Sequence, residues 1–133
     1  MISALFPYVA ETRDLTVRVS VNYLPEQSQP AGGRWFWAYH IRVENGGRMA
    51  AQLLTRRWEI TDARGTLQIV EGEGVIGEQP IIEPGGAYDY VSGCPLTTSS
   101  GSMVGSYRML GEDGSLFDID VPRFALRAPV VSG

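Results

Sequence analysis

The chain has 133 residues, which is enough for one ordinary domain and short for two. Apolar residues make up 44% and charged residues 20%, a balance typical of a globular domain and not of a disordered chain. The net charge is −4, all eleven basic side chains are arginines, and no basic block occurs, which argues against a nucleic-acid-binding surface.

The N-terminal residues MISALFPYVA lack the basic segment of a signal peptide, so we assign residues 1–12 to a variable N-terminal tail. No stretch approaches the roughly 18 apolar residues that a membrane span requires. Cys94 is the single cysteine, which excludes an internal disulfide and fits a reducing compartment. We therefore expect a cytoplasmic protein without membrane association, with one domain over residues 13–129.

Alternation of apolar and polar residues predicts a series of β-strands. In the third of them, Leu54, Trp58 and Ile60 are expected to share one face, and the last is expected to be a short edge strand because Pro122 and Pro129 bracket it. The predicted strands are Leu15–Tyr23, Trp35–Glu44, Leu53–Thr61, Leu67–Val70, Ala87–Ser92, Ser102–Leu110, Leu116–Val121 and Phe124–Leu126.

Turn residues separate these strands, as in Asn45-Gly46-Gly47 and Pro84-Gly85-Gly86. No window shows a sustained helical period. About eight short strands at regular spacing predict an all-β fold, an antiparallel β-sandwich.

The segment from Glu71 to Leu96 contains Gly72, Gly74 and Gly77 in a G-x-G-x-x-G spacing. A dinucleotide fingerprint must open a helix, whereas these glycines precede two prolines and two further glycines, which predict a loop, a short strand, a turn and a strand. One interpretation is a set of backbone N–H groups that binds phosphate, with Arg56 and Arg57 as the nearest cations.

The alternative is a purely structural loop whose glycines adopt positive φ angles. The carboxylates of Glu71, Glu73 and Glu78 surround the glycines and would repel a polyphosphate, so the sequence favours this structural interpretation.

Three further groups are candidates for chemistry. Asp118 and Asp120 share a predicted strand face and, with Asp113, are weak candidates for a magnesium or acid–base site, although solvation explains them equally well. His40 alternates with polar residues and is expected to be solvated. Cys94 lacks a nearby base in the sequence and is expected to be a small buried side chain rather than a nucleophile.

The aromatic run Trp35-Phe36-Trp37 places apolar side chains on both faces of its strand. Either a loop such as the N-terminal tail covers Phe36, or the run forms part of a partner-binding surface, because exposed aromatic side chains often anchor interfaces.

The segments YLPEQSQP (23–30), YHIRVENGG (39–47), LLTRRWEITDARG (53–65), VEGEGVIGEQPIIEPGGAYDYVSGCPL (70–96), SGSMVGSYRM (100–109) and FDIDVPRFAL (117–126) together resemble the bacterial ApaG family. The similarity runs from about Arg13 to Pro129 in the family's order and spacing. It implies an immunoglobulin-like or fibronectin-III-like sandwich. One departure is Arg57, where many relatives carry histidine, and this weakens a metal-ligand role for the position.

The resemblance also implies links to cobalt and magnesium efflux and to diadenosine tetraphosphate breakdown, without an established catalytic residue set. Related eukaryotic domains in F-box adaptors and in a DNA-polymerase-delta-interacting protein resemble protein-interaction modules. We therefore predict a non-enzymatic binding module with a protein partner and no cofactor. The alternatives are a nucleotide or dinucleoside-polyphosphate sensor at the glycine loop and a weak divalent-cation binder. Pairing of two copies through an exposed edge strand stays open.

Overall fold

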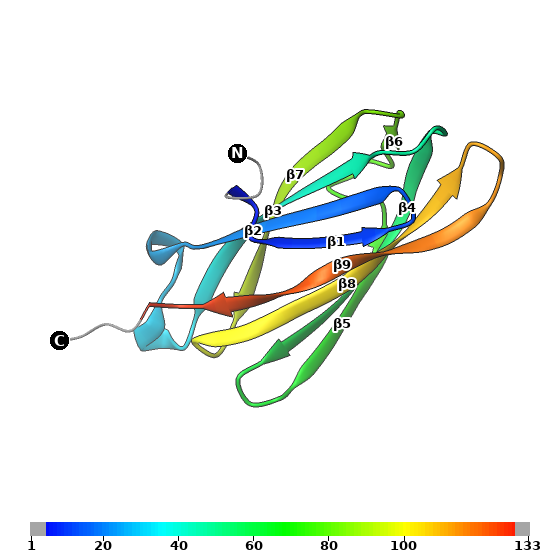
Figure 1. Ribbon diagram of the computed structural model, residues 1–133. Helices are drawn as coiled ribbons and strands as arrows, with labels where there is room; N and C mark the ends of the chain where they lie inside the picture. The colour runs from blue at the N-terminus through cyan, green and yellow to red at the C-terminus, as the bar shows by residue number, and fades with distance from the viewer. Residues whose placement is uncertain (1–4, 130–133) are drawn as a thin grey trace.

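The computed structural model describes residues 5–129, which form nine strands in two antiparallel sheets packed as a sandwich (Figure 1). The first sheet has the order β1-β2-β3-β7, and the second has the order β5-β4-β8-β9, with β6 beside β4. Their bounds are β1 Tyr8–Thr12, β2 Leu15–Tyr23, β3 Trp35–Asn45, β4 Ala51–Asp62, β5 Leu67–Glu73, β6 Ile81–Ile82, β7 Ala87–Leu96, β8 Ser100–Gly111 and β9 Leu116–Arg127. The predicted all-β, immunoglobulin-like sandwich is confirmed.

Short 3-10 turns, η1 at Pro25–Gln27 and η2 at Pro30–Gly32, interrupt the long connection between β2 and β3. Among residues 5–129, no helix is long and apolar enough to cross a membrane.

The core lies between the two sheets, where the alternating apolar side chains of both sheets meet. Within the core, the ring of Trp58 packs edge-on against those of Tyr39 and Phe124, with centroids 5.5 and 5.9 Å away. Fully buried side chains of this size each contribute about 1.5–3 kcal/mol through removal of apolar surface from water. The largest are Trp37, Tyr107, Phe124, Ile41, Leu53, Met103, Met109, Ile119 and Leu126.

A β-bulge in β4 changes which residues face the core. The register with β8 pairs Leu53 with Met109 but Thr55 with Arg108, so Leu54 is an extra residue. An extra residue reverses the alternation beyond it. Leu53 and Trp58 are therefore both buried, and Leu54 is only half-buried. The prediction that Leu54 shares a face with Trp58 is wrong for this reason.

The last two predicted strands are one continuous strand, β9. Its register with β8 shifts between Met103, which pairs with Phe124, and Gly105, which pairs with Val121. Pro122 lies in this irregularity, where a missing N–H does not interrupt the ladder. The expected break between Val121 and Phe124 is thus a bulge and not a strand end.

Residues 8–12 of the expected N-terminal tail form β1, which pairs with β2 from Tyr8–Val19 to Thr12–Leu15. The Tyr8 ring lies 6.0 Å from that of Phe124, and the Tyr8 hydroxyl accepts a hydrogen bond from the Ala125 N–H. These contacts join β1 to β9 and close one side of the sandwich. Residues 1–4 lie outside the described residues.

Asn45 is a buried polar residue at the end of β3, and it holds three segments together. Its Nδ2 donates to the carbonyls of Met49 and Ile82, both at 2.9 Å, and its Oδ1 accepts from the Gly47 N–H at 2.9 Å. The amide therefore satisfies the backbone of the β3–β4 loop and ties that loop to β6.

We expect Asn45→Ala to lower the free energy of unfolding by about 1–3 kcal/mol, because it leaves buried backbone groups without hydrogen-bond partners. Urea denaturation of the variant and of wild type measures the loss. The exposed Asn22→Ala provides the control, with an expected change within about 0.5 kcal/mol. Equal stability of the two variants would show that water replaces the Asn45 amide without cost.

Candidate functional site

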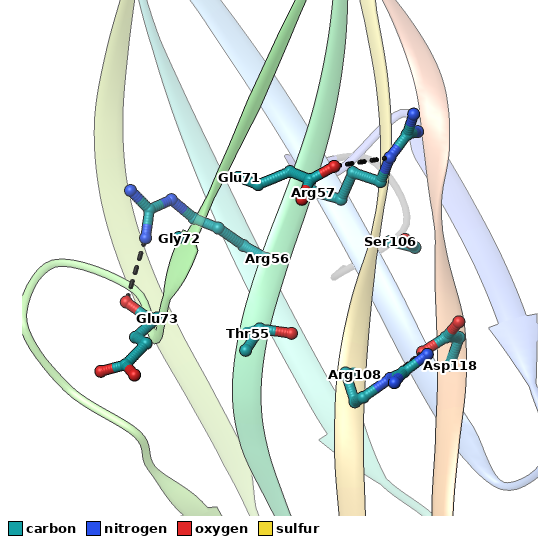
Figure 2. A pocket seen from close by; sticks show the side chains of 9 residues that line it. All are labelled: Thr55, Arg56, Arg57, Glu71, Gly72, Glu73, Ser106, Arg108 and Asp118. Carbon is teal, nitrogen blue, oxygen red and sulfur yellow. Dashed lines mark hydrogen bonds and ion pairs between the residues drawn. The ribbon is translucent and has the colours of Figure 1, made fainter.

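The outer face of the second sheet carries a shallow hollow of about 490 Å³ (Figure 2). Four adjacent strands supply its walls, so it exists only when the sheet is assembled. Its lining residues are Thr55, Arg56 and Arg57 on β4, Glu71, Gly72 and Glu73 on β5, Ser106 and Arg108 on β8, and Asp118 on β9.

The charges in this hollow largely neutralise one another. Arg57 donates to Glu59 at 2.8 Å and to Glu71 at 3.3 Å, and Arg108 donates to Asp118 at 3.0 Å. These hydrogen bonds raise the pKa of both guanidinium groups, chiefly through Glu59 for Arg57 and through Asp118 for Arg108. An anionic ligand would have to compete with carboxylates that are already in place.

Arg56 lies on the opposite side of β4 from Arg57 and is held by the backbone of β5. Its Nη1 donates to the carbonyls of Glu73 at 3.1 Å and Gly74 at 2.9 Å. Gly72 lies against this guanidinium: a Cβ at Gly72 would be 2.8 Å from Nη1. The absence of a side chain at Gly72 therefore makes room for Arg56.

The other two glycines of the motif shape a tight turn and do not line the hollow. The N–H of Gly74 donates to the Leu54 carbonyl at 2.8 Å. Val75 and Glu78 exchange backbone hydrogen bonds of 2.8 and 3.0 Å around Ile76 and Gly77. Gly74 and Gly77 have positive φ angles of 61° and 79°, as the structural interpretation of the loop requires. Three of the loop's N–H groups already have backbone acceptors.

The aromatic run divides between the two faces of β3. Trp37 is only 1% exposed, and its Nε1 donates to the Arg127 carbonyl at 3.1 Å. Trp37 therefore belongs to the core, which corrects its assignment to a partner-binding surface. Trp35 also packs against the core while remaining partly exposed. Phe36 points to the other face and covers Gly93 of β7, where a Cβ would be 2.4 Å from the ring.

His40 is part of a ladder of charged groups on the outer face of the first sheet. Its Nε2 donates to Asp89 at 2.7 Å, and Asp89 also accepts from Arg42 at 2.7 Å. Glu44 accepts from both Arg42 and Arg18 at 2.9 Å, and these two partners outweigh desolvation by burial, so the pKa of Glu44 is lowered. The ring of Phe6 packs edge-on against His40, with centroids 4.9 Å apart. His40 is thus half-exposed and paired rather than freely solvated.

Cys94 lies on the inner side of β7, opposite Trp37 in the register, whereas His40 lies on the outer face. The sheet therefore separates the thiol from the imidazole. Burial raises the pKa of the Cys94 thiol to about 11. A thiol in this environment stays protonated at neutral pH and is a poor nucleophile.

Cys94 is therefore expected to react with a disulfide reagent at pH 8 at least about 100-fold more slowly in the folded chain than in urea, because the thiolate fraction and access both fall on burial. Absorbance of the released thiolate follows the reaction. A native rate close to the rate in urea would place the thiol at the surface.

The acidic candidates do not converge. Asp118 is paired with Arg108, and Asp113 accepts from the hydroxyl and N–H of Ser115, which lowers the pKa of Asp113. Asp120 lies two residues beyond Asp118 on β9, where its N–H donates to the Thr12 hydroxyl at 3.0 Å. Within residues 5–129, no three His, Cys, Asp or Glu side chains are placed to hold one metal ion.

An apolar surface that the sequence-based predictions do not include lies beside the hollow. Leu67 and Ile69 are 51% and 49% exposed on β5, next to Glu71 and Glu73. The register pairs Ile69 with Glu59 and Glu71 with Arg57, which places all four β5 side chains on the outer face. We call Leu67, Ile69, Glu71 and Glu73 the β5 stripe. The alternation of residues 67–73 is a signal that could have found it.

Comparison with known proteins places the chain in a family. The ApaG domain model matches residues 25–111. Protein ApaG from Afipia carboxidovorans is 54% identical over 122 residues, 92% of this chain and 94% of the relative, and protein ApaG from Brucella suis is 51% identical over the same shares. A crystal structure of an ApaA protein from Bordetella pertussis superposes with a TM-score of 0.85 at 43% identity, covering 89% of this chain and 96% of that one. The chain therefore belongs to the ApaG domain family.

Proposed function

We propose that this chain is a non-enzymatic binding module that recognises a protein partner through β5 and the adjoining outer face of the second sheet. The observation that carries the proposal is the exposure of Leu67 and Ile69, about half accessible on an edge strand. Apolar side chains next to unpaired strand backbone form a surface that other chains pair with readily. Folded domains commonly protect such an edge unless it is used.

The arrangement of reactive groups supports binding rather than catalysis. Cys94 and His40 lie on opposite faces of the first sheet, so neither activates the other. In the hollow, Arg57 and Arg108 are paired with carboxylates rather than directed together at one point. A catalytic site requires acid, base and nucleophile within hydrogen-bond reach of one reacting atom.

We further propose that any association with cobalt or magnesium efflux runs through a cytoplasmic partner protein and not through metal ligation by this chain. The support is that Asp118 pairs with Arg108 at 3.0 Å and that, within residues 5–129, no three His, Cys, Asp or Glu side chains gather around one point.

The test is affinity capture from a bacterial lysate with wild type and two matched variants. Leu67→Lys/Ile69→Lys removes the exposed apolar pair, and Leu116→Lys removes a comparable exposed leucine, 59% accessible, on β9. We expect the double variant to recover at least about tenfold less partner while Leu116→Lys recovers as much as wild type. Thermal melts verify that all three are folded. Equal recovery by all three would overturn the proposed surface.

A second candidate is a sensor of nucleotides or dinucleoside polyphosphates, since Arg56, Arg57 and Gly72 all line the hollow. Calorimetric titration with diadenosine tetraphosphate, ATP and GTP tests it. Heat of binding that disappears in Arg57→Gln would favour the sensor. No heat at about millimolar ligand would place any dissociation constant above about 1 mM and would remove this candidate.

A further inference from the structure

We propose that β5 binds an extended segment of its partner by strand addition, and that this segment carries basic side chains followed by apolar side chains. The inference rests on the proposed binding function and adds the mode of recognition and the chemistry of the partner. Two independent features of β5 support it: the free edge of its backbone and the order of its side chains.

The free edge is a consequence of the sheet topology. Among the described residues, β5 pairs only with β4, through seven residue pairs from Thr55–Glu73 to Thr61–Leu67. Figure 1 shows β5 at the margin of the sandwich, on the side away from β1. In an antiparallel ladder, alternate residues direct their N–H and C=O groups away from the neighbouring strand. Apart from the Glu73 carbonyl, which already accepts from Arg56, the outer edge of β5 therefore offers a row of donors and acceptors to another strand.

The side chains of the β5 stripe specify which segment fits. From its N-terminal to its C-terminal end, the stripe changes from apolar (Leu67 and Ile69) to acidic (Glu71 and Glu73). Directly opposite residues on neighbouring strands interact most strongly, and opposite charges or paired apolar groups are favoured. A complementary strand places apolar side chains beside Leu67 and Ile69. It places basic side chains beside Glu73 and beside Glu71, which already accepts from Arg57 at 3.3 Å.

A second copy of β5 does not meet this requirement. Antiparallel pairing about a two-fold axis would place Glu73 beside Leu67 and Glu71 beside Ile69, whereas parallel pairing would place each glutamate beside its own copy. The first arrangement desolvates carboxylates against apolar groups, and the second opposes like charges. The stripe therefore favours a foreign segment over self-association.

We expect the foreign segment to add antiparallel to β5, because antiparallel pairs are slightly more stable than parallel ones. This direction fixes the order of its side chains. Read from its N-terminus, the segment meets Glu73 first and Leu67 last. Outward side chains at every second position are therefore basic, basic, apolar and apolar. The acetylated and amidated octapeptide Thr-Arg-Thr-Arg-Thr-Val-Thr-Val has this pattern and serves as the probe.

The experiment is a titration of the isotope-labelled chain with this peptide, followed by backbone amide shifts. We expect saturable shifts confined to β5 and its neighbours β4 and the 74–78 turn. The reversed peptide, Val-Thr-Val-Thr-Arg-Thr-Arg-Thr, is expected to bind wild type at least about tenfold more weakly than the probe does. The probe itself is expected to lose at least about tenfold in affinity for the variants Glu73→Arg and Leu67→Lys/Ile69→Lys. Leu116→Lys is expected to bind like wild type.

N-methylation of the peptide separates backbone pairing from side-chain adhesion. Methyl groups on the amides of alternate residues are expected to abolish binding when those amides face β5, and to leave binding unchanged on the other set. Equal effects of the two sets, or no shifts at about 1 mM probe, would each overturn strand addition. Equal binding of the reversed peptide would overturn the antiparallel direction of the added strand. Sedimentation of the unliganded chain as a β5-dependent dimer would also overturn it.

The outcomes distinguish this inference from the function on which it rests. If the probe fails while Leu67→Lys/Ile69→Lys still loses the captured partner, the surface binds a protein by another mode, and only strand addition is wrong. If the double variant captures as much partner as wild type, the proposed binding surface itself is wrong, whatever the peptide does.

Discussion

Replacing Trp37 with alanine is expected to lower the free energy of unfolding by about 3–5 kcal/mol, because the change removes a large buried ring and leaves a cavity. The Trp37 side chain is 1% exposed, lies 5.6 Å from the Tyr23 ring between centroids, and donates through Nε1 to the Arg127 carbonyl at 3.1 Å. The variant loses that hydrogen bond together with the packing. Any loss of partner capture by this variant would therefore report unfolding.

Urea denaturation followed by far-ultraviolet circular dichroism measures this loss. Trp37→Phe is the conservative control and should retain most of the stability, because it keeps an aromatic ring and forfeits mainly the hydrogen bond and part of the volume. An alanine variant within about 1 kcal/mol of wild type would contradict the burial of Trp37.

Replacing Gly74 with alanine is the second change with a large expected effect. A Cβ at this position would lie 2.1 Å from the Glu78 carbonyl oxygen, and the φ angle of 61° belongs to the left-handed region. The clash involves backbone, so a rotamer change cannot relieve it. Left-handed conformation alone costs about 1–2 kcal/mol for an alanine, and the clash is expected to bring the loss of stability to roughly 3–4 kcal/mol.

Gly77→Ala is the matched control in the same turn. Gly77 has a φ angle of 79°, yet no atom beyond its two chain neighbours lies within 4 Å of a Cβ built there. We expect its alanine variant to lose only the conformational contribution, about 1–2 kcal/mol. Equal losses at the two positions would show that the turn relaxes around Gly74. Loss of nucleotide binding in a Gly74 variant would consequently not identify a phosphate site, because the turn itself is disrupted.

The strands could largely be predicted from the sequence because half-buried strands alternate strictly. Alternation placed Trp37, Tyr39 and Ile41 on one face, and all three are buried in the core. Alternation predicted the wrong face for Leu54, which is the extra residue of a β-bulge in β4. No distinctive side chain marks such a bulge, because it depends on pairing with a strand that is distant in the sequence. Alternation also missed β1, whose packing against Phe124 joins residues more than 100 positions apart.

The candidate site was harder to predict because it depends on register. The predicted residues Arg56, Arg57 and Gly72 do line one hollow, whereas Gly74 and Gly77, predicted with them, shape a separate turn. The partners of Arg57 lie on β4 and β5, and Asp118 reaches the same hollow from β9. No local spacing in the sequence shows these neighbours. The apolar end of the β5 stripe is visible in the sequence, but its exposure follows from the edge position.

Site-specific photo-cross-linking tests the binding of a protein partner at β5 most directly. A benzophenone amino acid is placed at Leu67 on the β5 stripe or at Val91, which is 58% exposed on β7 of the other sheet. Each variant is illuminated in bacterial cells that express it. We predict a discrete covalent adduct to another protein from position 67 and none from position 91. Adducts of equal yield from both positions, or adducts from position 91 alone, would contradict a binding surface at β5.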